Sequence, residues 1–377
     1  MNAQIKRFAA AILIAVSFAA VIPVSYAQPK VNTSAKAMAL IDCETGKVLS
    51  EENGDLKLPM ASTTKIMTAL IVLENCDINE EFEIPREAVG VEGSSICLEE
   101  DEKMTVIDLL YGLMLASGND AAVALAVHTS GSVSAFVDLM NERAANLGLK
   151  STHFITPNGL HDEKHLTTAY ELCLITREAL KNEVFARIVS TKYYTAGSGA
   201  KQRTFKNKNS LLWNYEGAFG VKTGYTMAAG RCLVFGAERD GMRIVGAVLN
   251  CRPMFETAER LLDQAFSDWV RMTVVEEGAT VLKTFVQNSG GSILEVETKD
   301  SIIEVMKKSE EASFRLEPVL SGNISAPVAK GETVGYLRVF RDDEIVGVAD
   351  LIAADDVLPS GFKYWWDMLI GLFVSNH

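Results

Sequence analysis

The sequence has no excess of positive charge, and this absence excludes one large class of function. Its 377 residues include 36 Lys and Arg against 49 Asp and Glu, a formal net charge of −13. Proteins that bind nucleic acid through its phosphates need a basic face, so we expect no nucleic-acid partner. Hydrophobic residues make up 48% of the chain, which is enough for a folded core.

Histidine and cysteine are also scarce. The five histidines and six cysteines form no Cys-x-x-Cys pair and no cluster at zinc spacing, so we expect neither a metal ion nor a cofactor. The even number of cysteines permits disulfides in an exported chain, but we expect mostly buried free thiols. No Gly-x-Ser-x-Gly segment is present to host a Ser-His-Asp triad. We therefore interpret His153, His161 and His165 as structural.

Long apolar runs are few, and one stands at the N-terminus. Two basic residues precede the apolar stretch Phe8–Ile22, and the small residues Ser25 and Ala27 occupy the −3 and −1 positions of a cleavage site. This pattern is typical of a secretory signal peptide, which we assign to residues 1–27. The alternative is an uncleaved N-terminal anchor. Both interpretations place the rest of the chain outside the cytoplasm.

A second apolar segment ends the chain. Residues 358–377 place six apolar side chains on one helical face: Phe362, Trp365, Trp366, Leu369, Leu372 and Phe373. The run is shorter than the ~20 residues that a spanning helix needs. Paired tryptophans favour the bilayer interface, so we predict an amphipathic anchor helix that lies in the membrane surface. The alternative is a terminal helix docked on its own domain.

The pattern between the two ends predicts an α+β domain and a small all-β domain. Residues 28–272 contain a predicted hairpin at 37–50, helices at 62–74, 168–180 and 256–270, helical stretches on both sides of 117–119, and strands between 220 and 250. Such strands from both ends of the segment favour one antiparallel sheet with a helical cluster. Residues 273–357 show short runs of period-two alternation, which predict the all-β domain.

Ser62 and Lys65 are the first candidates for chemistry. In the segment "ASTTK" they stand three residues apart on a predicted helix, so their side chains share a face. A serine hydroxyl becomes a nucleophile when a base takes its proton. Lysine can be that base if burial and a second cation lower its pKa. The alternative interpretation is an N-cap serine followed by a solvent-facing lysine.

Two tripeptides further along the chain strengthen the catalytic interpretation. Ser117-Gly118-Asn119 breaks a helical pattern and would expose a hydroxyl and an amide to a cleft. Lys222-Thr223-Gly224 begins a strand, where a glycine lets a substrate backbone lie close to the edge. Each tripeptide alone is a weak signal, but the three motifs in this order are a strong one.

Together these motifs resemble the S-x-x-K, S-x-N and K-T-G set of penicillin-binding proteins. The chain is similar to the low-molecular-weight members, the serine-type D-alanyl-D-alanine carboxypeptidases, in the segments 61–69, 117–119, 156–162, 165–172 and 221–226. The resemblance implies a β-lactamase/transpeptidase-like catalytic domain, a small all-β domain and a C-terminal amphipathic helix. It also implies a location at the extracytoplasmic face of the bacterial cell membrane.

The resemblance implies a role for each motif residue. Ser62 would attack the carbonyl of the penultimate D-alanine and form an acyl-enzyme, while Lys65 accepts its proton. Ser117 would relay a proton to the leaving amine, and Asn119 would hold the substrate amide. Lys222 would complete a hydrogen-bonded pair of cations.

The remaining positions concern the substrate. Thr223 would bind the terminal carboxylate, Gly224 would allow close approach, and the backbone N–H of Tyr225 would form an oxyanion hole with that of the nucleophile. Some family members have an arginine before the K-T-G motif, where this chain has Lys208. Lysine keeps the charge but loses the bidentate fork, so Arg252 is the other candidate for the carboxylate.

Three alternatives share these motifs. A class A β-lactamase would need a glutamate in an E-x-x-L-N segment, and the closest match, at Glu171, lacks the asparagine. A D,D-endopeptidase of peptidoglycan cross-links would use the same residues, and a non-catalytic β-lactam- or cell-wall-binding protein would keep only the scaffold. The expected partners are peptidoglycan pentapeptide stems, β-lactams as covalent inhibitors, and the membrane surface. The acidic run 99–102 is interpreted as a solvated loop.

Overall fold

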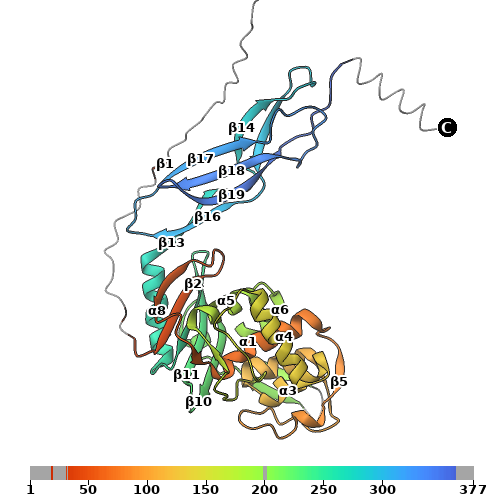
Figure 1. Ribbon diagram of the computed structural model, residues 1–377, viewed down its shortest axis with the longest axis vertical. Coiled ribbons are helices and arrows are strands. Elements are labelled where there is room, and N and C mark those ends of the chain that lie inside the picture. Colours follow the sequence, from red (N-terminus) through yellow and green to blue (C-terminus); the bar gives the residue numbers. More distant parts are fainter. Residues whose placement is uncertain (1–17, 20–30, 32, 198–201, 362–377) are drawn as a thin grey trace, which may run out of the picture. The chain divides into compact units, whose positions relative to one another are not determined.

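The computed structural model describes residues 18–19, 31, 33–197 and 202–361, whose contacts divide the chain between Trp269 and Val270 (Figure 1). The unit before the division combines helices with a five-stranded sheet, and the unit after it consists of strands. The sequence had suggested a boundary after residue 272. Residues 358–361 of the predicted C-terminal helix are described and are not helical, and residues 362–377 lie outside the described residues. The predicted signal peptide also lies outside them, apart from Phe18–Ala19.

The five-stranded sheet of the first unit joins strands from both ends of that unit. Its order is β10 (Ala218–Thr226), β11 (Gly230–Arg239), β12 (Met242–Leu249), β2 (Ala37–Asp42) and β3 (Val48–Glu52), and every pairing is antiparallel. β2 is buried along its whole length. An unbroken apolar strand of this kind is expected where a sheet is covered on both faces. The predicted mixed α+β architecture is confirmed.

Helices make up most of the remainder of this unit. Their bounds are η1 (Ala61–Thr64), α1 (Lys65–Asn75), η2 (Arg86–Ala88), α2 (Val106–Tyr111), the π-helical η3 (Gly112–Ala116), α3 (Asn119–Ser130), α4 (Val133–Asn146), α5 (Ala169–Ala179), α6 (Glu183–Ser190), α7 (Leu211–Asn214) and α8 (Met254–Asp268). The break at 117–119 is confirmed. The sequence analysis missed α4 and α6, although the capping side chains of Ser132 and Asn182 mark where they begin.

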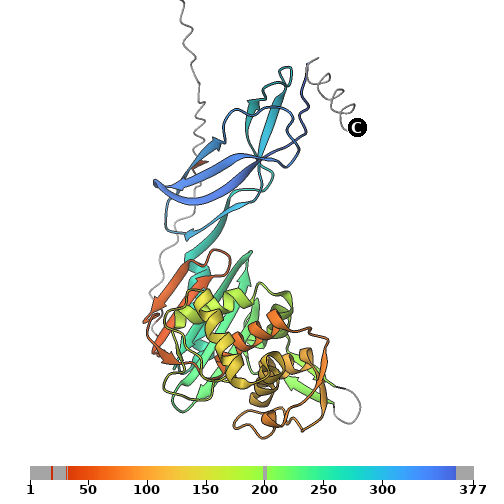
Figure 2. The same ribbon diagram turned by 45° about the vertical axis from the view of Figure 1, so that its right-hand side comes forward.

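Helix α1 lies at the centre of the cluster. Its first eight residues, Lys65–Val72, are all buried, and it contacts α3, α4, α5 and α6 (Figure 2). The sequence had predicted a helix over residues 62–74, with its apolar residues 66, 69, 70 and 73 on one face. Because neighbours surround it, the structure buries the other face as well, and with it the side chain of Lys65.

Three two-stranded ribbons border the helices. They pair β4 (Leu58–Pro59) with β7 (Leu166–Thr167), β5 (Glu81–Glu83) with β6 (Lys103–Thr105), and β8 (Tyr193–Ala196) with β9 (Arg203–Lys206). The prediction of a solvated acidic loop is wrong for Glu102, which is 6% exposed. Its carboxylate lies 2.9 Å from the guanidinium of Arg203, a partner that is distant in sequence and invisible to a local reading.

The second unit consists of β-strands, as predicted. A six-stranded sheet has the order β1 (Phe18–Ala19), β17 (Ser313–Leu320), β18 (Thr333–Arg341), β19 (Glu344–Ala353), β15 (Ile293–Thr298) and β14 (Thr280–Phe285), and β13 (Trp269–Val275) pairs with β16 (Ile302–Lys307). Within the described ranges, no single helix is long and apolar enough to cross a membrane, although the bent pair α3 and α4 passes by length and composition. All six cysteines are free thiols, three of them buried.

Candidate active site

The amine of Lys65 lies next to the hydroxyl of Ser62. Ser62 lies in η1, one turn before the first residue of α1, and Lys65 Nζ stands 3.1 Å from Ser62 Oγ. The amine also donates to Asn119 Oδ1 at 2.7 Å and to the carbonyl oxygen of Asn158 at 2.6 Å. A neutral amine has two N–H groups and one lone pair. With the two carbonyl oxygens taking the N–H groups, the lone pair is left for the Ser62 hydroxyl.

The surroundings of Lys65 favour its neutral form. Complete burial lowers the pKa of its amine well below the ordinary value, and the positive charges of Lys222 and Lys208 lower it further. These are the two conditions, burial and a second cation, that the sequence analysis set for a lysine base. Burial and the charge of Lys208 also lower the pKa of Lys222, to about 7.

Ser117 and Lys222 form a second hydrogen-bonded pair. Lys222 Nζ donates to Ser117 Oγ at 3.1 Å and to the carbonyl oxygen of Thr223 at 2.9 Å. Ser117 ends η3 with a left-handed backbone, φ 65°. A non-glycine residue in this region carries strain, which is common at functional sites, and here the conformation carries the chain from η3 into α3.

Asn119 connects the amine of Lys65 to the segment that carries Glu92. Its Oδ1 accepts from Lys65, and its Nδ2 donates to the carbonyl oxygen of Glu92 at 2.6 Å. The side chain therefore orients the lysine, and one of the two N–H groups of Nδ2 is used by Glu92. The contact of Asn119 with the substrate amide stays a prediction. The Asn158 carbonyl was missed by the sequence analysis because a backbone acceptor has no residue signature. The segment 156–162 had pointed to this loop without giving the contact.

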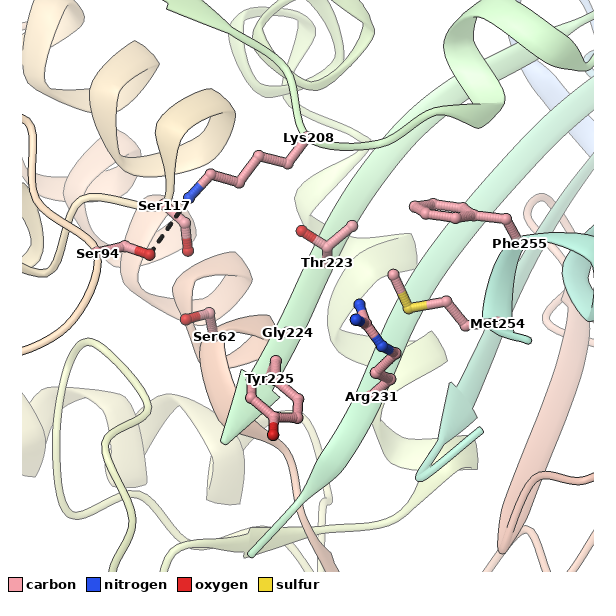
Figure 3. A pocket seen from close by; sticks show the side chains of 10 residues that line it. All are labelled: Ser62, Ser94, Ser117, Lys208, Thr223, Gly224, Tyr225, Arg231, Met254 and Phe255. Carbon is pink, nitrogen blue, oxygen red and sulfur yellow. Dashed lines mark hydrogen bonds between the residues drawn. The ribbon is translucent and has the colours of Figure 1, made fainter. Parts of the chain in front are cut away.

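A pocket of about 300 Å³ opens in front of the hydroxyls of Ser62 and Ser117 (Figure 3). The side chain of Thr223 borders it from β10, and Arg231 borders it from β11. Lys208 reaches it from the opposite rim, where its amine donates to Ser94 Oγ at 3.2 Å. Its complete lining is Ser62, Ser94, Ser117, Lys208, Thr223, Gly224, Tyr225, Arg231, Met254 and Phe255.

Strand β10 approaches the backbone of the nucleophile at Gly224. A Cβ at this position would lie 3.1 Å from the backbone nitrogen of Ser62 and 3.1 Å from the carbonyl oxygen of Met60. A side chain would therefore crowd the predicted oxyanion hole. Glycine leaves this space open.

Arg252, the arginine that the sequence suggested for the carboxylate, lies in the same pocket lining as Arg231. Arg252 lines a second pocket with Pro253, and this pocket shares Arg231, Met254 and Phe255 with the pocket in front of Ser62. Arg231 itself was missed by the sequence analysis. It is the direct partner of Tyr225 across the β10–β11 hairpin, and its guanidinium lies 5.7 Å from the centre of the Tyr225 ring.

Two polar residues weighed from the sequence serve the scaffold. The Glu171 carboxylate accepts from the backbone N–H groups of Lys150 and Ser151 and from the Thr152 hydroxyl, and it does not line the pocket. Burial lowers the pKa of His165 to about 4, and this ring hydrogen-bonds Thr64 Oγ1 at 2.8 Å. Among the residues that the structure describes, no group of three or more His, Cys, Asp or Glu side chains is placed to hold a metal ion.

Comparison with known proteins identifies the family of this chain. The model of the family described as D-alanyl-D-alanine carboxypeptidase matches residues 23–252, more than half of the chain. The chain belongs to this family. Residues 270–358 match a second model, described as the C-terminal domain of penicillin-binding protein 5. The predicted membership among the low-molecular-weight penicillin-binding proteins is confirmed.

Individual relatives agree with the two models. D-alanyl-D-alanine carboxypeptidase DacF of Bacillus subtilis is 35% identical over 95% of this chain and 96% of its own length. The structure of penicillin-binding protein 5 from Haemophilus influenzae matches with a TM-score of 0.72 at 28% identity, over 88% of this chain and 99% of that one. The Streptomyces K15 DD-transpeptidase structure matches with a TM-score of 0.62 at 35% identity, over 64% of this chain and all of that one.

Proposed function

We propose that this chain is a serine-type D-Ala-D-Ala carboxypeptidase that removes the terminal D-alanine of peptidoglycan stem peptides through an acyl-enzyme on Ser62. The observation that carries the proposal is the position of the Lys65 amine, 3.1 Å from Ser62 Oγ and held by two carbonyl oxygens. Family membership supports the same reaction.

Acylation follows from the hydrogen bonds of the site. The neutral amine of Lys65 takes the Ser62 proton as Oγ attacks the carbonyl of the penultimate D-alanine. Negative charge then develops on the carbonyl oxygen of the substrate, beside the backbone N–H groups of Ser62 and Tyr225, which act as the oxyanion hole. Ser117, held by Lys222, gives its hydroxyl proton to the departing amine of the terminal D-alanine and takes up the proton that Lys65 received, so that Lys65 is neutral again. The products are an ester on Ser62 and free D-alanine.

Deacylation uses Lys65 as the base again, now toward a water molecule. A water molecule gives one proton to the neutral amine of Lys65 and attacks the ester carbonyl. The bond from the carbonyl carbon to Ser62 Oγ then breaks as Lys65 returns that proton to Oγ, which releases the peptide acid and restores both the hydroxyl and the neutral amine. Glu171 has no part in this step because three donors of residues 150–152 occupy its carboxylate. A β-lactam ring opened by Ser62 would therefore remain bound longer than in an enzyme with a glutamate that activates water.

The direct test combines D-alanine release with intact-mass measurement. We expect release of one D-alanine from each pentapeptide and, with penicillin, a one-to-one adduct that persists for minutes or longer. Rapid turnover of penicillin without a lasting adduct would support the β-lactamase alternative instead. Cleavage of cross-linked dimers without release of terminal D-alanine would support the endopeptidase alternative.

A second prediction concerns the substrate carboxylate, which we place between Thr223 and Arg231. Both side chains line the pocket, and a guanidinium binds a carboxylate with two parallel hydrogen bonds. We expect Arg231→Gln to raise KM for a D-Ala-D-Ala peptide about tenfold, the loss of one charge-assisted contact, with a smaller change in kcat. The same kinetics on Arg252→Gln provide the comparison. A larger rise in KM for that variant would assign the carboxylate to Arg252.

A third prediction concerns location. We propose that residues 1–27 direct export and that the C-terminal segment anchors the chain to the outer face of the cytoplasmic membrane, because its paired tryptophans and short apolar run suit the bilayer interface. We expect truncation after Gly361 to release the signal-cleaved chain from membranes, with D-alanine release unchanged. Sedimentation of the truncated chain with membranes would contradict the anchor.

A further inference from the structure

We infer that the tip of the β14–β15 hairpin forms a second membrane contact, in which Phe285, Ile293 and Leu358 lie in the bilayer interface. The inference rests on the proposed anchor and goes beyond it, because it assigns a lipid-contacting surface to the folded all-β unit.

Three large apolar side chains are exposed at one end of the unit. Phe285 is 73% exposed, Ile293 59% and Leu358 67%. Phe285 and Ile293 are direct cross-strand partners, so their side chains stand together on one face of the hairpin. Their neighbours in the chain, Val286 and Leu294, are buried in the core of the unit. Exposed apolar groups of this size gathered at one place mark an interaction surface.

The chain leaves the unit at this same hairpin. The backbone N–H of Ser360 donates to the carbonyl oxygen of Asn288 at 2.8 Å, and a Cβ on Gly290 would meet the Ser360 side chain. Both contacts lie in the loop that joins β14 to β15. Residues 362–377, which carry the paired tryptophans, therefore begin beside the hairpin tip. An anchor that starts here holds the tip within a few residues of the membrane surface.

The hairpin tip itself is uncharged, whereas the segment that leads to it carries the exposed Asp355 and Asp356, three and two residues before Leu358. The hairpin loop, residues 286–292, contains no ionisable side chain. The β18–β19 hairpin, about 26 Å away along β19, carries Asp342, Asp343 and Glu344, which anionic lipids repel. On the β14–β15 face the next cross-strand pair is the ion pair of Lys283 and Glu295. Because moving these two charged side chains from water into the bilayer costs free energy, the proposed lipid contact is limited to the tip of the hairpin.

Two other occupants would compete with the bilayer for the patch: residues 362–377 folded back on it, or a second copy of the chain. The bilayer is favoured because residues 362–377 carry a large apolar surface with two tryptophans. Three side chains of the patch are too few to cover that surface, whereas lipid can cover it completely.

Vesicle binding of the full chain tests the inference with a matched control. We expect F285S/I293S to lower the partition of the chain onto phosphatidylglycerol–phosphatidylcholine vesicles about tenfold, because two apolar side chains no longer enter the interface. I345S/V348S changes two apolar side chains of similar exposure, 53% and 59%, in the same unit. We expect this control to bind within about twofold of the unchanged chain. Equal binding by both variants would overturn the inference, and unchanged melting temperature and D-alanine release establish that each variant is folded.

Two further measurements separate this inference from the anchor proposal. Truncation after Gly361 tests the anchor alone: a truncated chain that binds as well as the full chain contradicts the anchor, whereas an inert F285S/I293S change contradicts only the hairpin contact. Hydrogen exchange of residues 284–294 identifies the occupant. We expect protection when vesicles are added. Protection in the lipid-free full chain that disappears on truncation would overturn the inference in favour of the chain's own tail, and protection that depends on protein concentration would do so in favour of a second copy.

Discussion

Ser62→Ala is expected to abolish both penicillin acylation and D-alanine release while the fold remains intact. The proposed reaction passes through an ester on this hydroxyl, and alanine offers no atom that could form it. Removal of the nucleophile in serine hydrolases lowers kcat by about 10⁶-fold. The change deletes one oxygen at the edge of an open pocket, so we expect little effect on stability. Intact mass with penicillin and a D-alanine assay measure the two losses.

The matched control for this variant is Ser190→Ala. Ser190 is an exposed serine at the end of α6 whose hydroxyl bonds only its own helix, so both activities should be retained. A covalent penicillin adduct on the Ser62→Ala chain would contradict the assignment of the nucleophile. Retained D-alanine release without an adduct would contradict the acyl-enzyme itself.

The three motifs of the site were predictable because each is a short run of side chains with a chemical role. Ser62 with Lys65, Ser117 with Asn119, and Lys222 with Thr223 all lie within local segments of the sequence. The structure then places the first lysine and the serine of the second motif next to partners 54 and 105 residues away. The sequence order of the motifs suggested this assembly, but the distances come only from the fold.

What sequence reasoning missed depends on contacts between distant segments. The backbone carbonyl oxygen of Asn158 accepts a hydrogen bond from the Lys65 amine, although the two residues are 93 positions apart. Every residue type has such a carbonyl, so the sequence gives no sign of this contact. Arg231 enters the pocket because the β10–β11 register sets it opposite Tyr225. Glu102 is buried because β9 brings it an arginine. Such partners follow from tertiary packing, which overrides the local expectation for a charged residue.

Lys65→Arg is expected to remove acylation, because it places a permanent positive charge where the reaction needs a neutral amine. Arginine stays protonated at every accessible pH, so it cannot take the Ser62 proton. Loss of a general base costs about 10²–10⁴-fold in rate, and we expect the acylation rate with penicillin to fall within that range. The exposed Lys164→Arg is the matched control. Unchanged acylation by Lys65→Arg would show that the site needs a cation and no base.

The pH dependence of acylation tests the same point without changing Lys65. Because only the neutral amine accepts a proton, the rate should fall as the pH drops through the pKa of Lys65. The charge of Lys222 lowers that pKa, and the charge of Lys208 lowers it less. Lys222→Gln should therefore move the acid limb of the profile to higher pH, and Lys208→Gln should move it by a smaller amount in the same direction. A limb that stays in place, or moves to lower pH, in both variants would mean that another group titrates in the acylation step.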